Sequence, residues 1–397
     1  MLQVKKGPVG PFKIKSVRKT ADAECAPGGS CCSGEADAGS DKPPCCGPPT
    51  SKGGGTITEK VPGFIEWLDT PGGNVPRIAS SLGFSDHLGA CKARWGIGRM
   101  DFIVPPGLYA LGNPSATDPV LVTANYKMSY DIVRRELAGR NAWLLVLETH
   151  GINVWCAAGK GTFGTGETVR RVQSTRLAEV VNHRLLLLPI LGAAGVSARE
   201  VRSRTGFAVR FATIRARDLP EFLDNGMITT PAMQELTFTL AERLILTPIE
   251  MVAALKSSIP IIIILLLLGG IAEGGPSLAA RPVIAYFGAL MAGAFAAPLL
   301  LPWLPTRSFA IKGAFAGLVW ALVWHALNGE DGSASATAAS FLLLPAVASF
   351  LALNFTGSTP FTSRAGVKKE IRLALPVMAV ALLLGTALWV MGRFFPA

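Results

Sequence analysis

The segment 149–165 carries residue types that could hold a metal-containing cofactor. Its cysteine, Cys156, follows the helix-capping residue Asn153 by three positions, so the thiol is predicted to lie in the first turn of a short helix. Unpaired N–H groups and the positive end of the helix dipole favour a thiolate there, and the thiolate is the form that ligates metals. The following residues leave room for a large planar group: Ala157, Ala158, Gly159 and Gly161. A small buried cysteine at a tight strand–helix junction would have the same spacing, so both interpretations stay open here.

Two nucleotide-binding motifs match this segment by letter but not by position. Gly159-x-Gly161-x-x-Gly164 begins well after the predicted strand that ends at Leu147, and no acidic residue follows at the distance that a dinucleotide site requires. In Gly159-Lys160-Gly161-Thr162 the earlier glycine of a P-loop is misplaced, and the lysine is not followed directly by Ser or Thr. Neither motif supports nucleotide binding.

The elements that must position this loop alternate between strands and helices. Short apolar runs bounded by turn residues predict buried parallel strands at Val120–Thr123, Trp143–Leu147, Leu185–Ile190 and Ala208–Ile214. Helices are predicted at Met128–Leu137, at Glu167–His183, and from the capping box that Ser197 and Glu200 form to Gly206. This order predicts a Rossmann-like α/β domain with a mainly parallel sheet, in which ligands bind beyond the carboxyl ends of the strands.

Composition adds a membrane part to this domain. Of the 397 residues 50% are hydrophobic and only 16% are charged, with a formal net charge of +11. Soluble proteins carry about a quarter charged residues, and this composition excludes overall disorder, a collagen-like fibre and a small disulfide scaffold. A membrane-spanning helix needs roughly 17–25 mostly apolar residues. Five apolar stretches predict such helices: Ile259–Ala272, Pro282–Leu304, Phe309–Leu327, Ala338–Asn354 and Ile371–Met391.

Charges in the connecting loops predict the orientation of these helices. The basic side is expected in the cytoplasm together with the soluble part, and the C-terminus outside. Residues 1–24 show no apolar core of a signal peptide. His325 is interpreted as an interfacial or packing residue, so the helices are expected to act as an anchor or a docking surface. The basic side comprises Lys256, Arg307, Lys312, Arg364, Lys368, Lys369 and Arg372.

The N-terminal residues 1–55 are predicted to be a disordered, basic, cysteine-rich tail. Their spacing C-x5-C-C-x12-C-C fits neither a zinc ribbon nor the usual iron–sulfur motifs. Two vicinal pairs would suit a soft metal ion such as Hg(II), and a tail whose cysteines have no function is the open alternative. The pairs are Cys31–Cys32 and Cys45–Cys46. The predicted domains are therefore 1–55, an α/β domain at 56–255 and a transmembrane domain at 256–397.

Four motifs carry a resemblance to known corrinoid proteins: Pro106-Gly-Leu-Tyr109, Val122-Thr-Ala-Asn-Tyr-Lys127, Asn153-Val-Trp-Cys-Ala-Ala-Gly-Lys160 and Gly161-Thr-Phe-Gly164. Over about Gly63–Gly226 the chain resembles the large subunit of the corrinoid/iron–sulfur protein of the acetyl-CoA pathway. It is still more similar to the membrane-anchored corrinoid proteins of the mercury-methylation pair. The soluble subunit has an N-terminal four-cysteine cluster motif that this chain lacks, and it has no membrane helices.

This resemblance implies a corrinoid whose cobalt is ligated from below by the Cys156 thiolate, with the nucleotide base of the cofactor displaced. Cys91 has no counterpart in the family pattern and is interpreted as structural. The helix around Cys156 is expected to lie against the ring, and two further loops near the cofactor or its tail. The implied corrinoid contacts are Asn153, Val154, Trp155, Cys156, Ala157, Ala158, Gly159, Lys160, Gly161, Thr162, Thr123, Asn125, Tyr126, Gly192, Ala193 and Gly195.

The implied activity is a corrinoid-dependent methyltransferase that passes a methyl group from methyl-cobalt(III) to Hg(II). The implied partners are a ferredoxin-like protein with two [4Fe-4S] clusters, as reductant and Hg(II) donor, a folate-dependent methyl donor system, and membrane lipid. One alternative is a membrane-tethered corrinoid methyl carrier of acetyl-CoA pathway-like metabolism. A second is a non-catalytic membrane protein that binds heavy metals. Nucleic-acid binding is not expected, because no aromatic–basic platform accompanies the positive charge.

Overall fold

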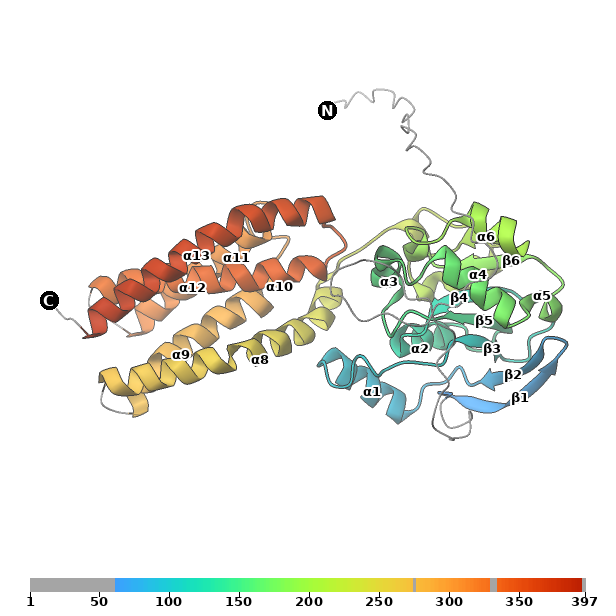
Figure 1. Ribbon diagram of the computed structural model, residues 1–397, viewed down its shortest axis with the longest axis horizontal. Coiled ribbons are helices and arrows are strands. Elements are labelled where there is room, and N and C mark those ends of the chain that lie inside the picture. The colour runs from blue at the N-terminus through green and yellow to red at the C-terminus, as the bar shows by residue number, and fades with distance from the viewer. Residues whose placement is uncertain (1–60, 274–275, 329–333, 395–397) are drawn as a thin grey trace, which may run out of the picture. The chain divides into compact units, whose positions relative to one another are not determined.

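Seven strands form one mixed sheet in the computed structural model, which describes residues 61–273, 276–328 and 334–394. Their order across the sheet is β1-β2-β3-β5-β4-β6-β7 (Figure 1). The pairs β5/β4, β4/β6 and β6/β7 are parallel, whereas β3 pairs with β5 antiparallel. The strands are β1 (Phe64–Thr70), β2 (Gly73–Ile78), β3 (Gly107–Leu111), β4 (Val120–Ala124), β5 (Ala142–Leu147), β6 (Leu185–Leu188) and β7 (Ala208–Phe211).

The four predicted strands are confirmed and form the parallel part of the sheet. Two of them are shorter than predicted: β6 ends at Leu188, because Pro189 precedes a 3-10 turn over Ile190–Gly192, and β7 ends at Phe211. Three strands at one edge, β1, β2 and β3, were not predicted. The β1–β2 hairpin is largely exposed, so its sequence lacks the continuous apolar run that identifies a buried strand.

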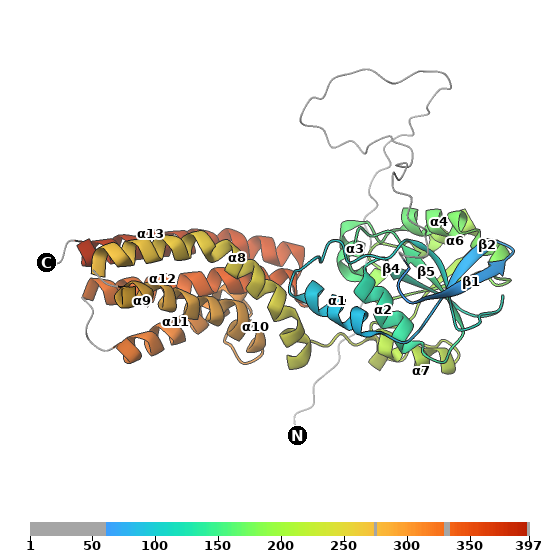
Figure 2. The same cartoon turned by 90° about the horizontal axis from the view of Figure 1, so that it is seen from below.

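Helices cover both faces of the sheet, and Figure 2 shows α4 and α6 on one side and α2 and α7 on the other. Neighbouring residues of a strand point to opposite faces, so Val120 and Val122 enter one core and Leu121 enters the second. The result is a three-layer α/β fold with two apolar cores. The helices are α1 (Phe84–Arg94), α2 (Lys127–Glu136), α3 (Val154–Lys160), α4 (Thr165–Ser174), α5 (Leu177–Val180), α6 (Ala198–Thr205) and α7 (Leu219–Asp224).

The helix predicted over Glu167–His183 is divided into α4 and α5. Arg176 adopts a left-handed conformation with φ of 48°, which a continuing helix cannot accommodate. The hydroxyl of Thr175 donates to the carbonyl of Arg171 at 2.8 Å, so the last turn of α4 closes on itself. At α6 the predicted cap is confirmed, because the Ser197 hydroxyl accepts from the backbone N–H of Glu200 at 3.3 Å.

A buried ion-pair network joins α1 to α2. The ammonium of Lys127 lies 2.5 Å from a carboxylate oxygen of Asp86 and 2.5 Å from one of Asp131. Arg134 is fully buried and contacts the same two carboxylates at 2.8 and 2.9 Å. Burial opposes ionisation of Asp86, but the hydrogen bonds from Lys127 and from the N–H of Gly83 together hold its pKa below the usual value. Two cations and two carboxylates thus balance each other, and they fix α1 against the sheet domain.

The C-terminal part is a helical bundle. Five helical segments of the described residues are long and apolar enough to cross a membrane: Leu240–Leu268, Ala280–Leu299, Phe309–Leu327, Ala334–Gly357 and Ala365–Gly392. They come from α8 (Leu240–Glu273), α9 (Pro276–Met291) with a π-helical turn (Ala292–Ala296) and α10 (Ala297–Leu299), α11 (Phe309–Asn328), α12 (Ala334–Asn354) and α13 (Arg364–Phe394). Four of the five predicted stretches are helical throughout, and the helix in Pro282–Leu304 ends at Leu299; α8 begins well before the predicted boundary at 255/256.

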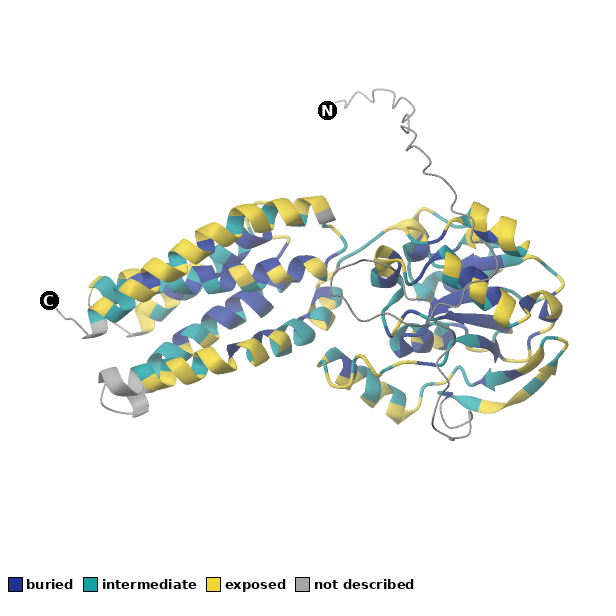
Figure 3. Cartoon of the chain, in the orientation of Figure 1, coloured by how far each residue is buried: buried dark blue, intermediate teal, exposed yellow. Residues whose placement is uncertain are grey.

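The outer surface of the bundle is apolar. Ile263 and Ile264 of α8 and Leu383 and Leu384 of α13 are all exposed, and Figure 3 shows much of both helices as exposed or intermediate. Inside the bundle the helices approach closely, because a Cβ at Gly313 would come within 2.5 Å of the Ala348 carbonyl oxygen. Apolar side chains outside and small residues between helices are typical of helices packed in lipid.

Candidate functional site

The helix that carries Cys156 forms as predicted. The side-chain oxygen of Asn153 accepts a hydrogen bond from the backbone N–H of Cys156 at 2.9 Å and caps α3. Gly161 ends the helix with φ of +85°, a left-handed conformation that glycine adopts without strain. The Cys156 thiol is free and partly exposed. The structure therefore presents this thiol at the surface of the first turn and excludes a fully buried cysteine.

Asn125, at the end of β4, holds the loop that leads into α3. Its side-chain oxygen accepts from the backbone N–H of Thr149 at 3.0 Å and from that of Gly151 at 3.2 Å. Its amide group donates to Glu148 Oε1 at 2.7 Å, and that oxygen also accepts from the N–H of His150 at 2.8 Å. The residue is 1% exposed. Asn125 was predicted as a corrinoid contact. In the structure its side-chain oxygen and amide group both form hydrogen bonds that position the loop.

The loop between β5 and α3 turns sharply, and residues of α4 hold its first part in place. His150 and Gly151 both have positive φ, 55° and 70°. The backbone N–H of Glu148 donates to Glu167 Oε1 at 2.9 Å, and Arg171 binds the same carboxylate at 2.7 Å. Burial opposes ionisation of Glu167, but these two hydrogen bonds and the Arg171 charge hold its pKa below the ordinary value. A charged Glu167 thus anchors the end of β5.

On its other side α3 packs directly on the loop that follows β6. A Cβ at Gly195 would lie 2.2 Å from the carbonyl oxygen of Phe163 and 3.0 Å from the Cα of Ala158. A Cβ at Gly192 would lie 2.6 Å from the Phe163 ring, which is fully buried. Gly192 and Gly195 were predicted near the cofactor. The structure shows that their lack of a side chain lets the end of α3 approach this loop.

An apolar cavity of about 330 Å³ lies beside the first turn of α3, at the carboxyl ends of β4, β6 and β7. Four of the residues predicted as cofactor contacts line it: Thr123, Asn153, Val154 and Trp155. The sequence did not predict the cavity-lining residues that come from α2 and from the ends of the strands. The rule that ligands bind beyond strand carboxyl ends is the signal that could have found them. These further lining residues are Leu121, Val122, Ser129, Ile132, Val133, Leu187, Leu188, Pro189, Leu191, Ala212, Thr213, Ile214, Ala216 and Leu219.

The other predicted contacts divide into exposed and buried groups. Gly159, Lys160 and Gly161 are exposed on the last turn of α3, whereas Ala157 and Ala158 belong to the apolar core. Tyr126 is buried with its ring edge-on to Phe102, and Ala193 is exposed. Thr162 is partly exposed and its hydroxyl lies 3.4 Å from the Ala157 carbonyl oxygen. The small residues Ala157 and Ala158 therefore serve the packing of α3 in this structure.

The arrangement fits a large flat cofactor with a soft metal. A partly exposed thiol stands on the first turn of α3, an apolar cavity opens beside the same turn, and the last turn exposes two glycines. Thiolates are preferred ligands of soft metal ions, and an apolar cavity suits a planar ring. The proposed tail ligands Cys31, Cys32, Cys45 and Cys46 lie outside the described residues.

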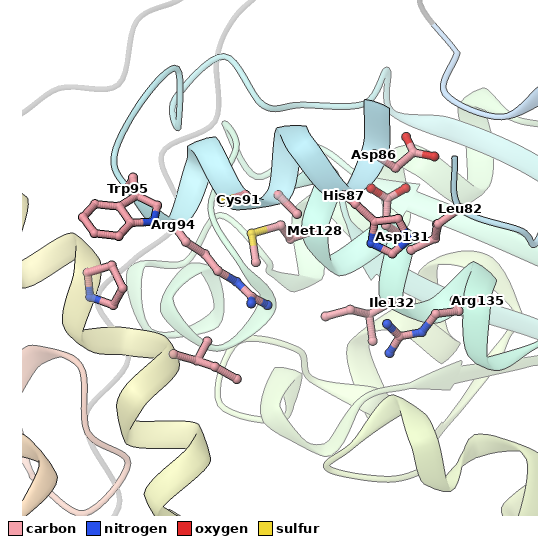
Figure 4. A pocket seen from close by; sticks show the side chains of 13 residues that line it. Leu82, Asp86, His87, Cys91, Arg94, Trp95, Met128, Asp131, Ile132 and Arg135 are labelled. Atoms are coloured by element: carbon pink, nitrogen blue, oxygen red, sulfur yellow. The ribbon is translucent and has the colours of Figure 1, made fainter. Parts of the chain in front are cut away.

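A second cavity, of about 400 Å³, is shown in Figure 4. His87, Cys91 and Trp95 line it from the α1 side and Met128 from α2. Cys91 was interpreted as structural; in the structure it is exposed and borders this cavity. Within the described ranges no group of three or more His, Cys, Asp and Glu residues could hold a metal ion.

Comparisons with known proteins concern the part of the chain that contains Cys156. The family model of the CO dehydrogenase/acetyl-CoA synthase delta subunit matches residues 99–222. The acetyl-CoA decarbonylase/synthase complex subunit gamma of Methanopyrus kandleri is 40% identical over 124 residues, which are 30% of this chain and 26% of that protein. The same subunit of Archaeoglobus fulgidus is 37% identical over 108 residues, 27% of this chain and 23% of that protein.

These comparisons correct one prediction. The matched proteins are named as subunits of the acetyl-CoA decarbonylase/synthase complex, so the prediction that this chain is a mercury-methylating methyltransferase is contradicted. The chain spans about a quarter of the length of these relatives. The central segment, from the loop before β3 to α7, is thus similar to subunits of that complex, and α8–α13 lie outside the match.

Proposed function

We propose that the chain is a membrane-tethered corrinoid methyl carrier that works with protein partners in a one-carbon metabolism like the acetyl-CoA pathway. The observation that carries the proposal is the position of the Cys156 turn beside the apolar cavity. Both lie in the segment that is similar to subunits of the acetyl-CoA decarbonylase/synthase complex. The exposed thiol and the cavity give that segment a place for a corrinoid.

Cys156 is the residue that would ligate the cobalt of the corrinoid. A bound corrinoid supplies a metal that carries a methyl group, and the protein binds, orients and shields it. The Asn153 cap fixes the turn on which the thiol stands, and Asn125 fixes the loop before it. A ligand held on a supported turn has one orientation toward the metal, which a flexible loop could not provide.

The 330 Å³ cavity is the place that we assign to the displaced nucleotide base of the cofactor. Its walls are mostly Leu, Val, Ile and Ala side chains, with hydroxyl groups from Thr123, Ser129 and Thr213. A flat heterocycle buries apolar faces in such a site and directs its few polar atoms to the hydroxyls. Trp155 lines the cavity and directly precedes Cys156 in the chain. Its side chain is 37% exposed, so it can contact either part of the cofactor.

The five apolar helical segments would tether this domain to the cytoplasmic membrane. Their exposed Ile and Leu side chains would otherwise face water, which is unfavourable by about 25 cal/mol per Å². By the positive-inside rule, Lys368, Lys369 and Arg372 at the start of α13 support a cytoplasmic position for that end and an outer position for the C-terminus. The α/β domain then works in the cytoplasm.

The partners follow from what a methyl carrier needs. It needs a folate-type methyl donor and a reductant, and we assign the second role to a ferredoxin-like protein with two [4Fe-4S] clusters. By its helices the chain is closer in architecture to the membrane-anchored corrinoid proteins of the mercury-methylation pair. By its central segment it is similar to subunits of the acetyl-CoA complex. The methyl acceptor separates these two families, and it is therefore a question for assay.

The test is the absorption spectrum of the full chain, produced with corrinoid available and purified in a mild detergent. We expect a corrinoid spectrum for the wild type and an altered spectrum for Cys156→Ala, because the lower ligand is lost. Cys91→Ala is the matched control, since its thiol is also exposed but lies on α1, and its spectrum should equal that of the wild type. Wild-type chain without bound corrinoid would contradict the proposal.

A second measurement identifies the acceptor. The methyl-loaded full chain is mixed with a nickel complex, a thiol or Hg(II), and loss of the methyl group is followed in each case. Transfer to nickel or to the thiol supports a carrier of one-carbon metabolism. Transfer to Hg(II) alone would contradict that role while leaving the corrinoid site itself in place.

A further inference from the structure

Helix α1 exposes an apolar stripe on its outer side. With 3.6 residues per turn, Phe84, Leu88, Cys91 and Trp95 fall within about 60° of one another around the helix axis. All four are exposed: Phe84 to 82%, Leu88 to 41% and Trp95 to 46%, with the Cys91 thiol beside them. We call these four residues the α1 stripe. Adjacent large apolar side chains that face outward mark an interaction surface.

The fold does not need the α1 stripe, because the opposite side of the helix does the packing. Ala93 is fully buried, and a Cβ at Gly89 would lie 2.6 Å from the Phe102 ring. The carboxylate of Asp86 turns inward to Lys127 and Arg134. The helix thus has a complete inner side. Of the stripe, Cys91 and Trp95 also border the cavity between α1, α2 and α8, whereas Phe84 and Leu88 are outside its lining and exposed.

The surroundings of the stripe are basic and apolar. Lys92 and Arg94 flank it on its two sides, and Ile97 and Met100 extend it into the following loop, where both are exposed. Arg94 and Trp95 also line the cavity in Figure 4. The Nε atom of Arg94 is buried and has no hydrogen-bond partner within the described part of the chain. Basic residues beside exposed aromatic and aliphatic side chains are typical of helices that lie in a lipid interface.

The loop after α1 contacts α8, the first of the candidate membrane helices. A Cβ at Gly96 would lie 3.0 Å from Ile249 Cδ1 and 3.8 Å from Val252 Cγ1. Helix α8 has 34 residues, so it is roughly 51 Å long by the rise of an α-helix. The hydrocarbon core of a bilayer is only about 30 Å thick. The half of α8 that contains Ile249 therefore has room to extend through the headgroup layer.

From these observations we propose that the α1 stripe inserts into the headgroup layer of an anionic membrane and lays the corrinoid domain against its surface. This inference rests on the proposed membrane tether. The loop that follows the stripe contacts α8, and the exposed Lys92 beside the stripe can meet lipid phosphates. Cations near such a surface each gain about 1 kcal/mol, which favours an anionic lipid over a protein partner without negative charge.

The test uses the full chain in vesicles of phosphatidylcholine and phosphatidylglycerol that contain a photoactivatable phospholipid. After illumination, the labelled peptides are identified by mass spectrometry. We expect label on the peptide of α1 and on those of α8 and α13, and none on α6, whose residues Arg199, Glu200 and Ser203 are exposed far from any apolar stripe. Removal of phosphatidylglycerol should reduce the label on α1 and leave that on α13 unchanged.

The double variant Phe84→Glu, Leu88→Glu should lose the α1 label, because two carboxylates cannot enter the interface. Ser85→Glu is the matched control, since it adds a charge to the same helix outside the stripe, and it should keep most of the label. An unchanged thermal melting curve shows that the double variant still folds, as expected for residues that make no core contacts.

The outcomes separate this inference from the tether on which it rests. Label on α13 but not on wild-type α1 overturns the inference and leaves the tether standing. Absence of label from both α1 and α13 overturns the inference and the tether together. Label on α1 that persists in the double variant also overturns it, and so does shielding of the stripe that appears only when a second protein is added, because the occupant would then be that protein.

Discussion

The side-chain oxygen of Asn125 accepts a hydrogen bond from the backbone N–H of Thr149 at 3.0 Å, and this contact joins the end of β4 to the end of β5. The two strands are parallel neighbours, so their carboxyl ends meet at one edge of the sheet. The loop that begins at Thr149 leads directly to α3 and Cys156. The position of the thiol therefore depends on a residue 24 positions upstream of the loop.

Asn125→Ala should loosen this loop. It leaves the buried N–H groups of Thr149 and Gly151 without their acceptor, which costs about 1–3 kcal/mol of unfolding free energy for a buried group. Denaturant unfolding and hydrogen exchange at both N–H groups check this. Asn182→Ala, at an exposed asparagine, is the control and should change neither. Unchanged exchange at Thr149 would show that the loop is held by other contacts.

Asn153→Ala should fray the first turn of α3. Loss of an N-cap side chain costs about 1 kcal/mol, and the N–H of Cys156 loses its acceptor, the Asn153 side-chain oxygen at 2.9 Å. We expect faster hydrogen exchange at Cys156 and faster reaction of its thiol with a maleimide. Asn153→Asp retains an acceptor oxygen and should restore slow exchange. Equal rates in all three proteins would argue against a role for the cap.

Gly195→Ala should displace α3 from the loop after β6. The new methyl group would start 2.2 Å from the Phe163 carbonyl oxygen, a backbone atom that cannot rotate away. We expect a lower melting temperature and weaker retention of corrinoid by the purified chain. Gly166→Ala is the matched control, because a Cβ there meets nothing within 4 Å and alanine favours the helix by up to about 1 kcal/mol. A Gly195→Ala protein as stable as the wild type would contradict the close approach.

Protonation of Glu167 at acid pH should weaken the contact by which this carboxylate holds the end of β5. Its pKa is lowered in the folded protein from an ordinary value of 4.5, so the charged carboxylate stabilises the fold fully above that pH. The contribution is lost as pH falls from 4.5 through the lowered folded value. Unfolding free energy measured between pH 7 and 3 should show this slope in the wild type, and Glu167→Gln should reduce it. Glu200→Gln, at an exposed carboxylate on α6, is the matched control.

Local sequence determined much of the fold and the centre of the site. The N-cap Asn153 and the following helical turn were predicted from adjacent residues, because a cap acts over three positions. The strands Val120–Ala124 and Ala142–Leu147 and the five apolar helical segments were predicted because each is one continuous apolar run. Strand β1 was missed because an exposed edge strand lacks the apolar run of a buried strand. Helix α1 was also missed, although its exposed apolar residues recur at helical spacing.

The sequence by itself thus determined the parallel strands β4, β5, β6 and β7 and the capped turn that carries Cys156, whose signals lie within a few neighbouring residues. Tertiary structure alone decided that Asn125 supports the loop at Thr149 and that Gly195 packs on Ala158. It also decided that the ends of three strands enclose a cavity beside α3. Each of these contacts joins segments that are far apart in the chain and meet only after the strands have paired. A local sequence pattern therefore does not predict them.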